Sequence, residues 1–529
     1  MQLNNFGKAM ALLSGFIAAC FYINAEKVVF LHTNDTHSTI EPLPDGTGGI
    51  LQRKAIIDSV KKAEDNIIVI DAGDIVQGTL YFKYFGGDVE YPLMNMTGYD
   101  YRVLGNHEFD NGMDALAHYY KGSESVPLSA NYDFSNTVLD GVFKKYDIRE
   151  IGDKKIGFFG INIDPSSIIA HKNIDVNFTD PIKAANETAS LLKNELGCDL
   201  VVAITHIGYE KVNEKPTDVD IATQSRDIDI IIGGHSHTLI DPRYPEIFPS
   251  LIANADGKLV RVVQVGKQGK FVGKITVDLD KTSEGDGTDW HYELIPVTNR
   301  FPQETLDAEM IEFLKPYRES VDSVNNKIIA WAAFDFPKER TGALPNLTAD
   351  FGKWYAQCLA DSVRQSGKEF PAVDFAIMNV GGIRDEIPAG KITEGEVLSI
   401  YPFSNNFVII AVKGADIIEA MKVAARKGGE AVSSEIKVIT DENGKLLHVL
   451  HNYKEIDPER EYVIGTIDYV AEGNDDLVSL ANHRKLLETD KEVSVPILEW
   501  IKLQARYGLP LMPDPESRFV KTIDFTEVK

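Results

Sequence analysis

In VLGNHEFDNG, residues 103–112, an apolar run ends at Gly105 and polar side chains follow at once. Asn106 and His107 are adjacent, and Asp110 comes three residues after His107. A tight turn accounts for the Gly and for the Asn, which tolerates a left-handed backbone. A turn does not account for the imidazole and the carboxylate, so a chemical role has to be considered for them.

Six short apolar runs surround this stretch in the first half of the chain, and several are rich in Val and Ile. Runs that are apolar throughout are typical of strands buried on both faces. Helical spacing in GGILQRKAIIDSVKKAE, residues 48–64, separates two of them. The pattern predicts a layered α/β domain, in which LVRVVQVGKQGKFVGKITVDLD, residues 259–280, reads as a hairpin. The runs are KVVFLH (27–32), NIIVIDAG (66–73), YRVLGN (101–106), KIGFFGIN (155–162), DLVVAITH (199–206) and DIDIIIGG (227–234).

Candidate ligands follow five of these runs, where each predicted strand ends. Loops at the carboxyl ends of strands in an α/β domain meet at one edge, so these side chains should converge. Alone, each has an ordinary explanation as an Asx-turn, a helix cap or a core histidine; their order and their placement at five strand ends argue against coincidence. The candidates are Asp35, His37, Asp74, Asn106, His206, His235 and His237, with His107 and Asp110 beside them.

The candidate ligands are imidazoles, carboxylates and one amide oxygen, without a thiolate. This set suits divalent Zn, Mn, Fe, Co or Ca and argues against a Cys-based structural zinc site. Seven ligands are too many for one tetrahedral ion. They suit two ions about 4 Å apart that share a carboxylate, for which Asp74 is the candidate.

The length and the net charge of the chain limit the number of domains and the kinds of ligand that it can be expected to have. A chain of 529 residues is too long for one hydrophobic core, so two or more domains are expected. A net charge of −26 disfavours binding of a nucleic-acid polymer. A small anionic substrate would need a locally positive site, built from metal ions or from Arg.

The N-terminus reads as a secretory signal peptide over residues 1–25, with Lys8 followed by an apolar run and small residues. Two ends compete: cleavage after Ala25, or a lipobox-like IAAC that would leave a lipidated Cys20. The apolar FYI after Cys20 favours simple cleavage. We therefore expect an exported protein, periplasmic or at the cell surface, that meets a membrane only through a possible lipid anchor at Cys20.

A second pattern begins after the first domain. Residues 26–300 form the predicted first domain, and residues 301–335 read as a helical connector broken at Pro316. Residues 336–529 alternate helices and strands again, which predicts a second α+β domain.

The motifs Asp-x-His, Gly-Asp-x-x-x-Gly, Gly-Asn-His-Glu, Thr-His and Gly-Gly-His-Ser-His, in this order, resemble the calcineurin-like metallophosphoesterase superfamily. LHTNDTH (31–37), GNHEFDNG (105–112) and the second domain narrow the resemblance to the secreted 5′-nucleotidase / UDP-sugar hydrolase family. The resemblance covers residues 27–520. It implies an α/β fold, with a four-layer αββα metallophosphoesterase domain that binds two metal ions, followed by a smaller α+β substrate-binding domain.

The resemblance also implies roles. One ion would be held by Asp35, His37, Asp74 and His237, and the other by Asp74, Asn106, His206 and His235. His107 would contact the phosphate without binding metal, and Asp110 would orient it and favour its charged form.

In the second domain, MNVGGIRDEI (378–387) resembles the family's Asn-Gly-Gly-Gly-Ile-Arg segment, and YPFSNNF (401–407) its Pro-Phe segment. By this resemblance the substrate would meet Asn379, Gly381, Gly382, Arg384 and Phe403, with Phe403 as one face of a clamp on the base. The family's second aromatic is replaced by Leu477 in GNDDL, and Val380 replaces a Gly. Half of the clamp is therefore expected to be aliphatic.

The function that the resemblance implies is hydrolysis of phosphomonoesters, above all nucleoside 5′-monophosphates, by a metal-bound hydroxide that attacks phosphorus in line. The second domain would rotate on the connector to deliver the phosphate. The missing aromatic leaves three other substrates open: a 2′,3′-cyclic nucleotide, a UDP-sugar and a non-nucleotide phosphate ester. A nucleotide-binding protein without catalysis would lack metal ligands, and none is missing here.

Overall fold

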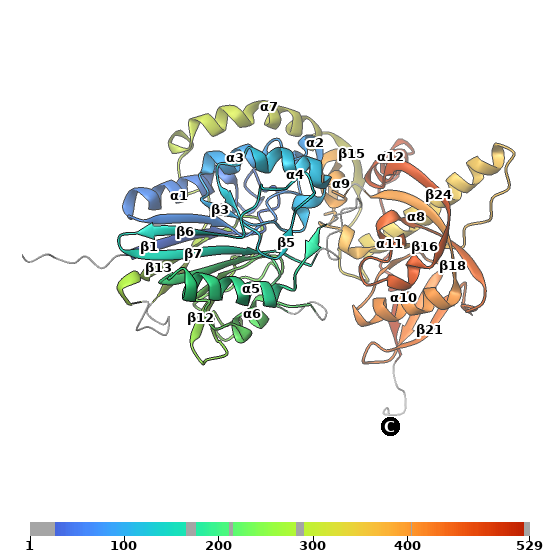
Figure 1. Cartoon of the computed structure of the whole chain (residues 1–529). Coiled ribbons are helices and arrows are strands. Elements are labelled where there is room, and N and C mark those ends of the chain that lie inside the picture. The colour runs from blue at the N-terminus through green and yellow to red at the C-terminus, as the bar shows by residue number, and fades with distance from the viewer. Residues whose placement is uncertain (1–26, 165–175, 211–214, 282–289, 404, 523–529) are drawn as a thin grey trace, which may run out of the picture.

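The computed structural model describes residues 27–164, 176–210, 215–281, 290–403 and 405–522 (Figure 1). The predicted signal peptide, with Cys20 and the cleavage position after Ala25, lies outside these ranges. Within them, no helix combines the length and the apolar character that crossing a membrane requires.

Two six-stranded sheets form the centre of the first domain. The strand order of the first sheet is β14 (His291–Pro296), β13 (Phe271–Asp278), β1 (Lys27–Thr33), β2 (Ile67–Asp71), β3 (Tyr101–Arg102) and β4 (Val126–Pro127). The order of the second is β11 (Leu251–Ala253), β12 (Leu259–Val263), β10 (Ile230–Ile232), β9 (Leu200–Thr205), β7 (Lys154–Ile161) and β6 (Tyr146–Ile151). A two-stranded ribbon joins β5 (Tyr132–Asp133) to β8 (Asn177–Phe178).

Side chains on alternate faces of each strand enter different cores. Phe30 on β1 packs with Phe158 of the second sheet, so these side chains fill the space between the sheets. Leu31, the next residue, packs instead with Ile57 of α1. On β9, Val202 faces the space between the sheets, whereas neighbouring residues pack against helices on the outer face.

Helices cover the outer face of each sheet (Figure 1), so the predicted four-layer αββα order is confirmed. The first sheet is covered by α1 (Ile50–Ala63), α3 (Glu90–Thr97) and α4 (Gly112–Lys121), with α2 (Leu80–Phe85) at its end. The second is covered by α5 (Pro181–Ser190) and α6 (Asp218–Gln224).

The predicted hairpin over residues 259–280 is wrong. β12 pairs with β10 and β11 in the second sheet, whereas β13 pairs with β1 and β14 in the first. The alternating pattern is real on β13, but alternation marks only a strand and not its partner. The loop between them crosses from one sheet to the other and carries Lys267 past the end of β1.

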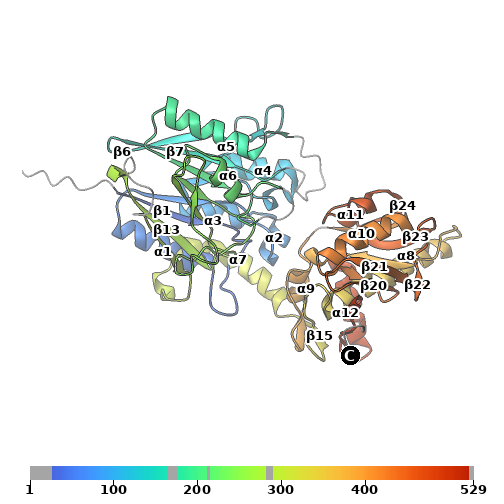
Figure 2. The same cartoon turned by 90° about the horizontal axis from the view of Figure 1, so that it is seen from below.

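The predicted break at Pro316 is also wrong, because α7 (Ala308–Asn325) continues through it. Pro316 lies on the exposed face of the helix, where water can hydrogen bond to a carbonyl that loses its intrahelical partner. α7 leaves the first domain, contacts α2 and leads to α9 at the second domain (Figure 2). Its Arg318 is hydrogen-bonded to Glu41 of the first domain at 2.6 Å (Nε to Oε1).

The second domain has a five-stranded sheet in the order β19 (Ala431–Val432), β16 (Phe375–Met378), β23 (Glu461–Ile467), β18 (Asn406–Lys413) and β24 (His483–Glu492). A four-stranded sheet follows the order β22 (Lys454–Glu455), β21 (Leu446–His451), β20 (Ile436–Thr440) and β25 (Phe519–Lys521). Strands β15 (Ile328–Ala332) and β17 (Gly390–Thr393) pair beside α7. The helices are α8 (Ala343–Gln365), α9 (Glu394–Ile400), α10 (Gly414–Arg426), α11 (Asp468–Ala471) and α12 (Ser494–Arg506).

Candidate metal centre and active site

The loops after β1, β2, β3, β9 and β10 meet at one end of the two sheets. They bring together all seven side chains that the sequence suggested as metal ligands. Three groups of side chains there are close enough to hold an ion: Asp35, His37 and His237; Asp74, His206 and His235; and His37, Asp74 and His107.

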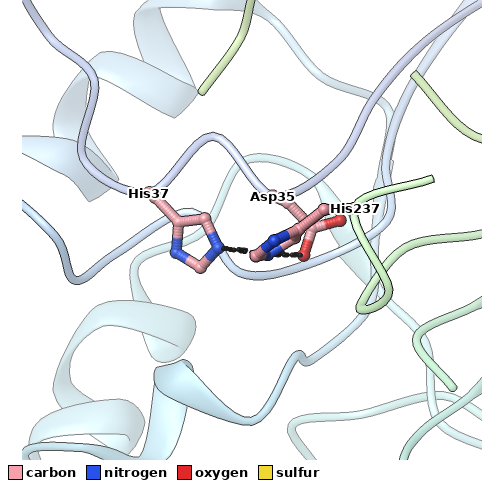
Figure 3. Close-up of side chains that lie close together, drawn as sticks. All are labelled: Asp35, His37 and His237. Carbon is pink, nitrogen blue, oxygen red and sulfur yellow. Dashed lines mark hydrogen bonds and ion pairs between the residues drawn. The ribbon is translucent and has the colours of Figure 1, made fainter. Parts of the chain in front are cut away.

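The first group lies between the loops after β1 and β10 (Figure 3). The Nε2 atoms of His37 and His237 are 2.9 Å apart, and His237 Nε2 is 3.5 Å from Asp35 Oδ1. Burial is the main reason that the pKa of His37 falls well below 6.5 and that of His237 falls to about 3. Two neutral imidazoles whose nitrogens face each other beside a carboxylate fit a divalent cation.

The second group lies on the other side of Asp74. His206 Nδ1 donates to the carbonyl of Ala72 at 2.6 Å, which turns its Nε2 toward Asp74 Oδ2 at 3.2 Å. That Nε2 is buried and, apart from its ion-pair contact with Asp74, has no hydrogen-bond partner among the described residues. His235 Nδ1 lies 2.9 Å from the amide oxygen of Asn106. An unpaired buried nitrogen beside a carboxylate, an imidazole and an amide oxygen also fits a metal ion.

Asp74 belongs to the group with His206 and His235 and also to the group with His37 and His107, so His37 links it to the first group. Burial alone would raise its pKa, but His206 and His107 hold the pKa well below 3.8, so the carboxylate is charged. The pKa of His206 rises to about 10: burial alone would lower it, but Asp74 and Asp35 favour the charged ring. Without metal, His206 therefore carries a proton that a bound ion would displace.

Backbone strain is concentrated at these ligands. Five of the seven have a positive φ: Asp35 (49°), His37 (45°), Asp74 (57°), His235 (80°) and His237 (57°). Non-glycine residues rarely adopt this conformation, and each costs roughly 1 kcal/mol or more unless the surroundings impose it. Its recurrence at ligand positions indicates that the loops are shaped for the site.

Gly105 has a purely steric role. A Cβ at this position would lie 2.0 Å from Asp74 Oδ1. The loop after β3 therefore approaches the shared carboxylate only because residue 105 has no side chain, which explains the Gly before Asn106.

His107 and Asp110 form the pair that the sequence predicted. His107 Nδ1 is 2.9 Å from Asp110 Oδ2, and both side chains are mostly buried. Burial would lower the pKa of His107, but the carboxylates of Asp110 and Asp74 outweigh it and raise the pKa above 6.5. The ring is therefore biased toward its charged form near neutral pH.

This pair predicts a pH shift. If the protonated ring is the active form, activity falls as pH rises through its raised pKa. Asp110→Asn removes a carboxylate that raises this pKa, so the alkaline fall in kcat/KM should move to lower pH, with a loss of about 10–100-fold in activity. Profiles of kcat/KM against pH test this. Asp114→Asn removes an exposed carboxylate four residues later and should change nothing; an unmoved alkaline limb in Asp110→Asn would refute the pairing.

Glu108 is a site residue that the sequence interpretation missed. Its buried carboxylate accepts backbone N–H groups from Asp74 at 3.1 Å, Ile75 at 2.8 Å and Gly105 at 2.5 Å. It thereby joins the loops after β2 and β3. The signal is present in the motif Gly-Asn-His-Glu, to whose Glu the sequence interpretation assigns no role.

The second domain reaches this centre through Arg384 and Phe403. The Phe403 ring lies 6.0 Å from the His107 ring between centroids, and the Arg384 guanidinium lies 5.5 Å from the centroid of Phe403. Asn379 donates from Nδ2 to Asp475 at 3.1 Å, and a Cβ on Gly381 would lie 3.0 Å from the same carboxylate. Gly382 lines a small pocket together with Asn379 and Phe403.

Leu477 does not lie with these residues. Its side chain is fully buried in the core of the second domain and is not available to a ligand in this structure. Val478, next to it, is 69% exposed and lines a cleft of about 720 Å³ that also contains Tyr469, Arg340 and His235. Phe178 also lines this cleft, and Tyr469 is the aromatic residue of the second domain that does so, eight residues before the position where the family has one.

Comparisons with known proteins agree with this geometry. Residues 28–239 match the family model of the calcineurin-like phosphoesterases, and residues 336–482 match that of the 5′-nucleotidase C-terminal domain. The 5′-nucleotidase of Vibrio vulnificus is 27% identical over 512 residues, which are 89% of this chain and 90% of that protein. The trifunctional nucleotide phosphoesterase protein YfkN of Bacillus subtilis is 27% identical over 74% of this chain, which spans only 27% of YfkN.

A solved structure shows the same architecture over nearly the whole chain. The 5′-nucleotidase precursor of Thermus thermophilus has a TM-score of 0.78 and 28% identity, and the match covers 94% of this chain and all of that one. With both family models matched in the same order, the chain belongs to the 5′-nucleotidase family of calcineurin-like metallophosphoesterases, which are metal-dependent phosphoester hydrolases.

Proposed function

We propose that the protein is an exported phosphohydrolase that uses two divalent metal ions to release phosphate from nucleoside 5′-monophosphates. One observation carries the proposal: Asp74 lies with His206 and His235 and also with His37 and His107. Phe403 of the second domain faces the His107 ring. The candidate metal ligands, the His107 imidazole and a side chain of the second domain thus lie next to one another. The predicted signal peptide supports export.

The chain's own residues would hold and stabilise the phosphoryl group. Asp35, His37, Asp74 and His237 would hold one ion, and Asp74, Asn106, His206 and His235 the other. Ions held there would supply Lewis-acid stabilisation of the phosphoryl oxygens and generate the nucleophile from water at neutral pH. His107, kept protonated by Asp110, would donate from Nε2 to a phosphoryl oxygen and stabilise the negative charge that grows there.

The nucleoside would occupy the cleft of about 720 Å³ next to His235. Tyr469, of which 7% is exposed, offers part of its ring for stacking. Arg340 and Lys427 offer positive charge beside lining carboxylates, one of which, Asp476, is ion-paired with Lys427. Arg384 and Phe403 would contact the substrate next to the metal centre. A monophosphate ester without a base would make none of the contacts with Tyr469.

This function predicts a selective effect of Tyr469→Ala. Loss of the ring should lower kcat/KM for AMP by about fivefold to tenfold, because aromatic stacking on a base contributes about 1–1.5 kcal/mol. Hydrolysis of p-nitrophenyl phosphate should be unchanged. The control is Tyr453→Ala, which removes a ring that is 87% exposed and lies in a remote turn.

A panel of AMP, a UDP-sugar, a 2′,3′-cyclic nucleotide and p-nitrophenyl phosphate, assayed with Mn or Zn, decides the substrate. Phosphate release should be fastest from AMP. Turnover of AMP no faster than that of p-nitrophenyl phosphate would reject the nucleotidase function, and faster release from another member would identify that substrate instead.

A further inference from the structure

A second cleft opens beside the metal centre, on the side of His37. Its volume is about 380 Å³, and its lining includes His37, Gln77, Lys267 and Arg384. The larger cleft is lined by His235 instead. The two clefts therefore reach the centre from its two ligand groups, and the nucleoside of the proposed reaction needs only the larger one.

Positive charge gathers at the smaller cleft. Within the part of the chain that the structure describes, the Lys267 ammonium forms no ion pair. Its pKa is lowered by partial burial and then by the charges of Arg384 and Lys338. Lys338 donates from Nζ to the carbonyl of Arg384 at 2.9 Å, so it adds a third cation nearby. Three cations gathered in a chain of net charge −26 mark a place where an anion would be stabilised.

Gln77 gives an independent indication of a ligand. Its side chain is 1% exposed, lines the same cleft, and neither its amide nitrogen nor its amide oxygen has a hydrogen-bond partner among the described residues. A buried amide left unpaired is costly, so such groups are normally satisfied. A phosphate oxygen in the cleft would accept from this amide.

Three carboxylates also line the cleft, and an arginine neutralises one of them. Glu41 is held by Arg318, from Nε at 2.6 Å and from Nη2 at 3.0 Å. Asp385 accepts the backbone N–H of Glu386 at 2.9 Å. Two of the three lining carboxylates, all except Asp322, thus have partners of their own.

We propose that this cleft is a second oxyanion subsite, in which Lys267, Arg384 and the Gln77 amide receive inorganic phosphate as it leaves the metal centre. The inference rests on the proposed function, because phosphate is a product of that reaction. If the nucleoside occupies the cleft beside His235, inorganic phosphate can leave the metal centre through the cleft beside His37. Each product would then leave on its own side.

The test compares Lys267→Met with Lys270→Met in the metal-loaded protein. Lys270 lies three residues later and is ion-paired with Asp45 at 3.5 Å, so it matches the charge change outside the cleft. Two quantities are measured: the inhibition constant of inorganic phosphate against p-nitrophenyl phosphate hydrolysis, and the dissociation constant of phosphate by calorimetry. Lys267→Met should weaken both about tenfold, Lys267→Arg should restore them, and Lys270→Met should leave them unchanged.

Three results would overturn the inference. The first is an unchanged phosphate affinity in Lys267→Met, and the second is an equal loss in Lys270→Met, which would indicate a general charge effect. The third is a raised KM for ADP in Lys267→Met without any change in phosphate affinity, which would mean that the subsite holds a phosphate still attached to a nucleotide. Calorimetry is independent of turnover, so an enzyme inactive on nucleotides would refute the proposed function and still test this subsite.

Discussion

Asp74→Asn is expected to lower kcat/KM by roughly 10³-fold or more and to reduce the metal content below two ions per chain. The substitution removes the charge of a carboxylate that is grouped with His206 and His235 and also with His37, and each 1.36 kcal/mol of lost transition-state stabilisation is a tenfold loss in rate. Asn has nearly the same shape and tolerates the left-handed backbone of this position, where φ is 57°. The loss can therefore be assigned to charge rather than to a collapsed loop. Metal analysis and steady-state kinetics measure the two effects.

Asp71→Asn is the matched control, because Asp71 is a buried carboxylate at the end of β2, three residues before Asp74. It accepts from Thr33 Oγ1 at 2.5 Å and from the backbone N–H of Gly73 at 3.0 Å, so it supports the loop from behind. Asp71→Asn should lower the free energy of unfolding while the metal content stays at two. Two ions and normal turnover in Asp74→Asn would remove Asp74 from its bridging role.

His107→Ala is expected to lower kcat by about 10²–10³-fold while both ions stay bound, because it removes a charged donor aimed at the phosphoryl group. Asn106→Ala should instead lower metal content, since the Asn106 oxygen points to the group formed by Asp74, His206 and His235. Substitutions of these two adjacent residues would thus lower activity for different reasons, one through the phosphoryl contact and the other through the metal content. Metal analysis of both variants, together with turnover at saturating metal, separates the two roles.

The structure makes this comparison necessary, because His37, Asp74 and His107 also lie close enough to hold an ion. If His107 were a ligand, both variants would lose metal equally, and the assignment of His107 to the phosphoryl group would be wrong. Added metal would then restore part of the activity of His107→Ala. Under the proposed mechanism, excess metal restores activity only in Asn106→Ala.

Local pattern was enough to predict the strands and the place of the ligands. The run around Phe30 is apolar on both faces because both faces are covered, and the structure places these faces in two different cores. The strand-end positions of Asp35 and His206 then follow from chain direction, since parallel strands end at one edge. The hairpin over residues 259–280 could not be judged in this way, because pairing partners are chosen by contacts between distant segments.

The second domain shows where local pattern fails at the site itself. Leu477 and Val478 are adjacent apolar residues, yet one is fully buried and the other is 69% exposed. Only the path of the loop between α11 and β24 decides which of them faces the cleft. Tyr469 lies before this loop, in α11, and lines the same cleft as Arg340.

The residue types at the strand ends, and hence the metal-ligand chemistry, can be read from the amino-acid sequence without a structure. The distances come only from the folded chain. They place Asp74 with His206 and His235 and also with His37, join two loops through Glu108, and put Lys267 and Gln77 in a separate cleft. The physical reason is the distance along the chain over which each kind of interaction acts. Strand and turn preferences act over a few residues, whereas the relative positions of loops come from the packing of two sheets and two domains, whose contacts join residues far apart in the chain.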